Sequence, residues 1–263
     1  AGSAFPVPRD LLRDELGFAR ISDNSIDAVG DRDFVAETLF AVTMISTHLS
    51  RLAEDLIIFG SSEFGFVRFG DTFSTGSSMM PQKRNPDALE LARGSAARAG
   101  GDLYTVLTTL KGLPSGYNKD LQEDKRALFD AVDMIRLVLA AVDGAVAELR
   151  FDGERMKMAL SSGLMATDLA DYLVTKGVSF RDAHAAVGTL VRESEEAGCD
   201  LSSLSDSSFH AAHPLFAEDA QDWLGADMSL SRREIPGGTG PDSVQRQLES
   251  ARKILGSAES ASA

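Results

Sequence analysis

Between residues 34 and 59, apolar side chains recur at steps of three and four, which is the period of an α-helix. The positions in this series are Phe34, Leu39, Val42, Ile45, Leu49, Leu52 and Leu56. We expect Asp31 to cap this helix at its start and Gly60 to end it. The same kind of spacing predicts a second helix from Asn85 to Leu110 and a third from about Leu121 to Leu149.

The third helix is apolar around most of its circumference, which is typical of a helix that is buried on most sides. One chain with three such helices offers too few partners, so we expect other subunits to supply the rest. The second helix contains Gly94, Gly100 and Gly101, which are poor helix formers. Glycines inside a helix are tolerated most easily where another backbone approaches closely.

Beyond Gly153 the predicted helices are shorter, and loops rich in Gly, Ser and Pro separate them. They are expected at 154–161, 166–175, 180–197, 208–211 and 242–255. No run alternates at period two for long enough to build a sheet. The sequence therefore predicts an all-α protein in two parts, a long-helix bundle at residues 1–157 and a small helical C-terminal domain at residues 158–263.

Composition narrows the range of functions. The 263 residues carry a formal net charge of -14, which argues against a nucleic-acid partner because phosphate binding needs a basic face. The most apolar segment is far shorter than the ~20 residues that a membrane helix needs. The sequence shows no metal-ligand spacing and no nucleotide-binding motif, so we expect neither a metal nor a cofactor. This composition suits a cytoplasmic protein.

Candidate chemistry is concentrated at residues 74–90, which read STGSSMMPQKRNPDALE. Pro81 and Pro86 restrict the backbone on both sides of a basic pair that includes Lys83. Asn85 stands at a helix N-terminus, where backbone N–H groups and the helix dipole favour an anion. A mobile surface loop is the simpler interpretation. The combination instead predicts a flexible lid that closes on an acidic small molecule.

A second polar cluster follows Gly116 and includes Tyr117, Gln122 and Lys125, which can face roughly one side of a helix start. Phenol, amide and ammonium groups are the groups expected to hold a polar, carboxylated ligand. An ordinary solvated helix start is the alternative interpretation of the same residues.

The segment GSSMMPQKRNP at residues 76–86 resembles the signature loop of the fumarase/aspartase superfamily, whose general form is Gly-Ser-Ser-x-x-Pro-x-Lys-x-Asn. Within that superfamily, MPQKRNPD is similar to the argininosuccinate lyases and their relatives the δ-crystallins. Four more stretches agree with this family, namely DRDFVAE at 31–37, HLSRLAED at 48–55, LPSGYNKDLQEDK at 113–125 and ATDLA at 166–170.

The resemblance implies a lyase that cleaves argininosuccinate to arginine and fumarate by β-elimination, the last step of arginine biosynthesis. It implies that Ser77, with Ser78 as the fallback, takes the Cβ proton, that Lys83 stabilises the negative charge, and that Glu90 orients a histidine general acid. The substrate-binding positions that it implies are Ser78, Asn85, Tyr117, Gln122 and Lys125. It also implies a homotetramer in which three subunits build each active site around a central bundle of long helices.

Members of this family carry a long further N-terminal portion that includes the histidine. We therefore expect this chain to be the C-terminal portion of such a lyase and to be inactive alone. Two alternatives stay open. One is another lyase of the superfamily, acting on adenylosuccinate, fumarate or aspartate, and the other is a non-enzymatic structural protein of the crystallin type.

Overall fold

The structure is a computed structural model that describes residues 1–76, 78–80 and 83–261. It divides into two units, Ala1–Arg155 and Met156–Ala263, where the sequence predicts a boundary after residue 157. Helices dominate both units, and the strands among the described residues are all two residues long, so the predicted all-α class is confirmed. None of the described helices is both long enough and apolar enough to cross a membrane.

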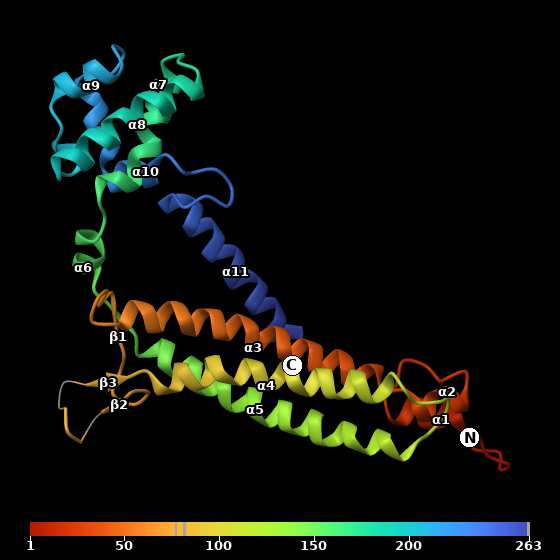
Figure 1. Ribbon diagram of the computed structural model, residues 1–263. Helices are drawn as coiled ribbons and strands as arrows, with labels where there is room; N and C mark the ends of the chain where they lie inside the picture. Colours follow the sequence, from red (N-terminus) through yellow and green to blue (C-terminus); the bar gives the residue numbers. More distant parts are fainter. Residues whose placement is uncertain (77, 81–82, 262–263) are drawn as a thin grey trace. The chain divides into compact units, whose positions relative to one another are not determined.

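The first unit is built on three long helices that lie side by side in Figure 1. Its helices are α1 (Arg9–Glu15), α2 (Ser25–Gly30), α3 (Asp33–Gly60), α4 (Asp87–Leu110), the 3₁₀-helix η1 (Lys119–Glu123) and α5 (Asp124–Ala147). The hydroxyl of Thr43 donates to the Ala99 carbonyl at 3.2 Å, and Arg93 pairs with Glu54, so α3 and α4 run antiparallel. The ion pair between Arg98 and Asp130 joins α4 to α5, and these two helices also run in opposite directions in Figure 1.

The start of α3 differs from the prediction by one residue. Arg32 is the N-cap, while the carboxylate of Asp31 accepts a hydrogen bond from the Asp33 N–H at 2.8 Å. Asp31 therefore satisfies one of the free N–H groups of the first turn from just outside the helix. At the other end the helix includes Gly60, and the C-cap is Ser61.

The buried face of α3 is only partly the stripe that the sequence predicts. Leu39, Val42 and Leu56 are buried as expected. Phe34, however, is 60% exposed, and Ile45 and Leu52 are exposed as well. Small residues at Ser46 and Ala53 fill the buried face instead. The predicted stripe combined two faces of the helix because both are apolar.

Within one chain, α5 buries one side against α3 and α4 and leaves other apolar side chains in solvent. The buried residues of α5 include Ala127, Ala131, Met134, Ile135, Val142 and Ala145. Large apolar side chains on the three long helices stay exposed at Phe34, Phe40, Met44, Ile45, Leu52, Ile58, Leu91, Tyr104, Leu107, Phe129, Leu137, Leu139 and Val146. A monomer that exposes so many large apolar groups on one bundle presents surface of the kind that other chains cover.

The first part of the connection after α3, from Val67 to Phe73, packs on the end of the bundle. A Cβ atom at Gly60 would lie 2.3 Å from the ring of Phe69, and one at Gly144 would lie 2.1 Å from the ring of Phe73. Both positions need glycine because the two phenylalanine rings pack directly on the backbones of α3 and α5. Strand β1 (Val67–Arg68) also pairs antiparallel with β4 (Arg150–Phe151), which follows α5.

The second unit is a set of short helices around its own core. After α6 (Gly153–Met158), where the chain divides, the elements are η2 (Ser162–Met165), α7 (Ala166–Thr175), α8 (Phe180–Ala197), η3 (Leu201–Ser203), α9 (Asp206–Ala212), η4 (Glu218–Leu224), α10 (Ala226–Ser231) and α11 (Pro241–Ala261). The fully buried ring of Tyr172 stacks on Phe216 at 5.8 Å between centroids and meets Trp223 edge-on. Inside this core, Asp168 accepts hydrogen bonds from Ser229 at 2.5 Å and Arg233 at 3.0 Å.

We predict that Asp200 stabilises the second unit in a pH-dependent way. Hydrogen bonds from Ser162, followed by those from Ser202, lower the pKa of the Asp200 carboxyl from 3.8 to about 2. A depressed folded-state pKa means that the stabilisation is present above the unfolded-state pKa and is lost as the pH falls toward about 2. Because Asp200 is largely exposed, Asp200→Asn should lower the free energy of unfolding at pH 7 by only about 1 kcal/mol.

Urea titrations of both proteins at pH values between 7 and 3 would measure this difference, which should shrink toward the acid end. The matched control is Asp227→Asn, because the one contact of its carboxylate among the described residues is with Lys157 at 3.7 Å. A difference between wild type and Asp200→Asn that stays constant with pH would contradict the assignment.

Candidate active site

The loop predicted to carry the chemistry is closed at its base by a short antiparallel strand pair. Strand β2 (Thr75–Gly76) pairs with β3 (Arg84–Asn85), with Thr75 opposite Asn85 and Gly76 opposite Arg84. The Thr75 hydroxyl donates to the carboxylate of Asp87 in the first turn of α4, and Arg84 forms an ion pair with Asp71. These contacts hold both ends of the loop against the N-terminus of α4.

The predicted loop residues occupy different positions around this base. Ser77, the predicted base, lies outside the described residues, as do Pro81 and Gln82 of the same motif. Ser78 and Lys83 are exposed, and the Lys83 N–H donates to the Met80 carbonyl at 3.0 Å. Asn85 is half-buried in β3, and Glu90 is exposed in the first turn of α4.

The second predicted cluster forms around η1, before α5. The Gln122 amide donates to the Tyr117 hydroxyl at 2.5 Å, so these two predicted substrate-binding groups do lie together. Lys125 follows in the first turn of α5, where its ammonium donates to Asp124 at 2.9 Å. Asp124 in turn accepts a hydrogen bond from Arg32, which lies 92 positions earlier in the chain.

Charge stabilises the ionised form of Asp124. Burial opposes ionisation, but hydrogen bonds from Lys125 and Arg32 outweigh it, so the pKa of the Asp124 carboxyl lies below its usual value. Asp124 therefore stays negative at neutral pH although its side chain is only 9% exposed.

The structure does not bring the two clusters together within one chain. The pairing of Arg98 with Asp130 places Lys125, five residues earlier in α5, beside about residue 103 of α4. Sixteen residues of helix separate that level from Asp87, which corresponds to about 24 Å at 1.5 Å per residue. Strands β2 and β3 at the base of the loop lie at one end of the bundle, and the connection between α4 and α5 lies at the other (Figure 1).

Open hollows lie at both ends of the bundle. One of about 940 Å³ lies next to the loop base and is lined by Arg68, Asp71, Arg84, Glu148 and Arg150, among others. Another of about 710 Å³ lies near the second cluster and includes Arg32 and Gly116. Over the described ranges, no three His, Cys, Asp or Glu side chains are grouped so that they could hold a metal ion.

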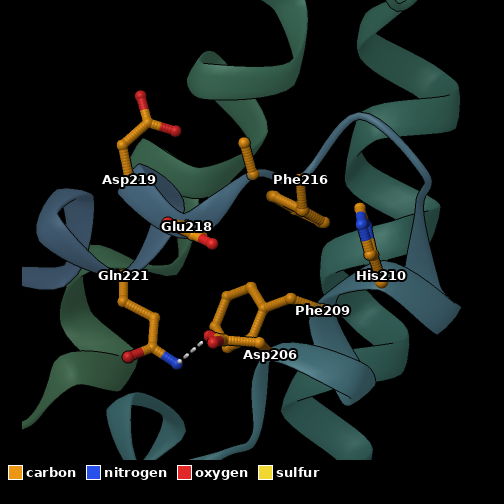
Figure 2. Close-up of a pocket in the computed structure, with 8 residues that line it drawn as sticks. Asp206, Phe209, His210, Phe216, Glu218, Asp219 and Gln221 are labelled. Carbon is orange, nitrogen blue, oxygen red and sulfur yellow. Dashed lines mark hydrogen bonds between the residues drawn. The ribbon is translucent and has the colours of Figure 1, made fainter.

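A further hollow, of about 580 Å³, lies in the second unit and is shown in Figure 2. The rim of this hollow is acidic, with Asp206, Glu218 and Asp219, and it also includes His210. The amide of Gln221 donates to Asp206 at 3.2 Å. No residue predicted from the sequence to take part in chemistry lines it. The aromatic side chains at its base, Phe209 and Phe216, are part of the buried core.

Known proteins that are similar to this chain include lyases whose names agree with the predicted family. A family model described as "Lyase" matches residues 1–101, and one described as "Argininosuccinate lyase C-terminal" matches residues 163–231. An argininosuccinate lyase of Roseiflexus sp. (strain RS-1) is 55% identical over 97% of this chain. The chain is a homologue of the argininosuccinate lyases. It spans 56% of the length of that relative.

The homology extends to eukaryotes and to solved structures. An argininosuccinate lyase of Schizosaccharomyces pombe is 48% identical over 97% of this chain and is covered over 55% of its own length. The crystal structure of an EDDS lyase in complex with formate is similar with a TM-score of 0.89 and 30% identity, covering 99% of this chain and 54% of that one. The expected resemblance to argininosuccinate lyases, over nearly the whole of the chain, is thereby confirmed.

Sequence reasoning missed the residues that hold the two clusters in place. Thr75 and Asp71 flank the loop, and a Thr or Asp beside a glycine-rich turn is a weak signal that occurs at many surface loops. Arg32 is a partner of Asp124 only in three dimensions, because 92 residues separate them in the chain.

We predict that Thr75→Val loosens the base of the loop. The change removes the hydrogen bond to Asp87 but keeps the shape of the side chain. A lost bond to a charged acceptor should raise the rate of tryptic cleavage after Arg84 by about 5-fold in the native protein. Mass spectrometry of a timed digest measures that rate.

The matched control is Thr38→Val, because the Thr38 hydroxyl bonds only to the Phe34 carbonyl of its own helix. That variant should be cleaved after Arg84 at the wild-type rate. If Thr75→Val were also cleaved at that rate, the contact with Asp87 would not hold the loop.

Proposed function

We propose that this chain forms part of a lyase that cleaves argininosuccinate to arginine and fumarate. The observation that carries the proposal is the 55% identity to an argininosuccinate lyase over 97% of the chain, together with the loop GSSMMPQKRNP. The substrate is a small dianionic succinyl group joined to a cationic guanidino group, so exposed ammonium and amide side chains at the two clusters suit its carboxylates.

The reaction requires a proton to leave the carbon next to a carboxylate. The electron pair left behind places negative charge on that carboxylate, and the C–N bond to the guanidino group then breaks to give fumarate. Lys83 and Asn85 supply a cation and an amide donor for this charge. Ser77 takes the proton, with Ser78 as the fallback base. The serine acts as an alkoxide, which Lys83 and nearby N–H groups stabilise.

The departing nitrogen needs a proton, and the general acid that provides it is a histidine outside these 263 residues. Glu90 orients this histidine from the first turn of α4. Tyr117, Gln122 and Lys125 bind the substrate, and neither a metal nor an organic cofactor takes part. This chain alone is therefore inactive, and activity belongs to the full-length protein in the cytoplasm.

A homotetramer in which subunits share active sites accounts for the separation of the two clusters. The loop and Lys125 stand about 24 Å apart along α4, which exceeds what one small substrate can bridge. Apart from its chain neighbours and the nearby backbone of α4 itself, a Cβ atom at Gly94, Gly100 or Gly101 would have no described atom of the chain within 4 Å. The close approach that these glycines permit therefore comes from another subunit, as does the cover for the exposed apolar side chains.

Relatives of other specificity share the fold, including the EDDS lyase at 30% identity. Argininosuccinate is favoured as the substrate, because this chain is 55% identical to an argininosuccinate lyase over 97% of its length. The test is a spectroscopic assay of fumarate release by the full-length protein from argininosuccinate, adenylosuccinate, aspartate and EDDS, with fumarate hydration measured separately. Activity on argininosuccinate alone supports the proposal, and absence of turnover would favour a structural protein.

We predict that Ser77→Ala in the full-length protein lowers kcat by about 10³-fold, the scale of a lost general base. The protein should keep its assembly and its unfolding temperature. Ser95→Ala is the matched control, since the Ser95 hydroxyl bonds only to the Ala92 carbonyl of α4. Near-normal turnover of Ser77→Ala would reject its role, and a loss confined to Ser78→Ala would assign the base to Ser78.

We also predict that two variants, each with little activity at a substrate concentration well below the KM of Lys125→Met, restore activity when they are mixed. Ser77→Ala alters the loop and Lys125→Met the other cluster, so a site shared between subunits can receive both intact groups in a mixed assembly. Co-refolding equal amounts should recover up to about a quarter of the wild-type sites. Recovery would be absent if one subunit supplied both clusters to the same site.

A further inference from the structure

Asp124 connects two cations that come from opposite ends of the first unit's sequence. Its Oδ1 atom accepts from the Lys125 ammonium at 2.9 Å, and its Oδ2 atom accepts from Nε of Arg32. Arg32 is the N-cap of α3, while Asp124 and Lys125 begin α5. Each oxygen of one carboxylate therefore holds one cation, and the group joins the starts of two helices.

The three charged side chains differ sharply in how far they are buried. The side chain of Arg32 is 14% exposed and that of Asp124 is 9% exposed, whereas that of Lys125 is 51% exposed. Two mostly buried charges thus fix one end of the arrangement, and the ammonium at the other end faces solvent. A buried ion pair of this kind holds its geometry tightly, because either partner alone would be left uncompensated.

Arg32 is itself held by the backbone. Its guanidinium donates to the Asp31 carbonyl at 2.6 Å, a contact that favours its present position beside Asp124. Because Arg32 neutralises much of the charge on Asp124, the carboxylate can orient the Lys125 ammonium without cancelling its attraction for another anion. Without Arg32, the full charge of Asp124 would compete with a substrate carboxylate for Lys125.

We propose that Asp124 and Arg32 are positioning residues that hold the Lys125 ammonium where it binds a carboxylate of the substrate. The proposal rests on the proposed function, because it assigns a task to the lysine of the second cluster. Arg32 and Asp124 do not touch the substrate themselves. Their effect appears in substrate binding and passes entirely through Lys125.

The test is a double-mutant cycle in the full-length enzyme, with argininosuccinate as substrate. Asp124→Asn removes the charge that orients Lys125 and should raise KM about 10-fold, with kcat changed by less than about 3-fold. Lys125→Met should raise KM at least as much. The double variant should have the KM of Lys125→Met alone within about 2-fold, because Asp124 has nothing left to position.

A purely structural role for Asp124 predicts the opposite result. Damage to the fold would add to the loss of Lys125, so KM of the double variant would exceed that of Lys125→Met by the same 10-fold. Additive effects in the cycle would therefore overturn the proposal.

Asp130→Asn is the matched control, because Asp130 also stands on α5 and also pairs with an arginine, Arg98 of α4. It lies outside both clusters, so KM should stay at the wild-type value. A rise in KM equal to that of Asp124→Asn would show that any lost ion pair of the bundle has this effect, and would count against positioning.

Arg32→Lys keeps the positive charge and provides a cycle that does not depend on the stability of Asp124→Asn. It should raise KM by about 3-fold, less than Arg32→Met, since an ammonium pairs with Asp124 without the fixed direction of a guanidinium. Both increases should vanish in a Lys125→Met background. Equal KM values for Arg32→Lys, Arg32→Met and wild type would overturn the role of Arg32.

The two proposals fail in different ways. If the wild-type full-length protein releases no fumarate from argininosuccinate, the proposed function is wrong and the positioning role falls with it. If wild type is active but the cycles are additive, only the positioning role is wrong.

Discussion

The length of α4 is the constraint on which the proposed active site depends. A hydrogen-bonded helix of 24 residues has a fixed rise, so its ends cannot approach each other. The signature loop is attached to its first turn, through Thr75 and Asp87. Tyr117 and Gln122 follow its last turn. The groups proposed to act in one reaction thus lie toward one end of the helix or the other, which supports the proposal that a complete site uses more than one copy of the chain.

The energetics of the bundle also support the proposed association. Two short cores join the three long helices, but large apolar side chains such as Phe129 and Leu137 remain in solvent. Burial raises the pKa of the Asp102 carboxyl on α4, and its Oδ2 atom has no hydrogen-bond partner among the described residues. An unpaired buried oxygen costs free energy. Exposed apolar faces and an unpaired carboxylate oxygen raise the free energy of the isolated bundle. Association with other chains that cover these groups would therefore stabilise it.

Sequence alone predicted the parts of this structure that depend on local periodicity. The bounds of α3, α4, α7 and α8 follow the spacing of apolar residues and the positions of glycine and proline. The short helices α2 and α10 were missed, because six residues hold too few apolar positions to show a period. The buried face of α3 was only partly right, since periodicity does not tell which of two apolar faces turns inward. The candidate residues came from the signature loop and from the stretch at 113–125, whereas contacts such as that of Arg32 with Asp124 link distant segments and leave no local pattern.

Both proposed clusters place a lysine against the start of a helix, and this choice has an electrostatic cost. The N-terminus of a helix carries partial positive charge, so a cation there is unfavourable unless an anion is near. Asp87 and Glu90 supply negative charge in the first turn of α4, and Asp124 supplies it for α5. These carboxylates keep the folded protein stable while the site is empty. In the proposed site, a substrate carboxylate would meet an ammonium whose charge is only partly offset, so part of the free energy given up in the empty protein would be recovered on binding.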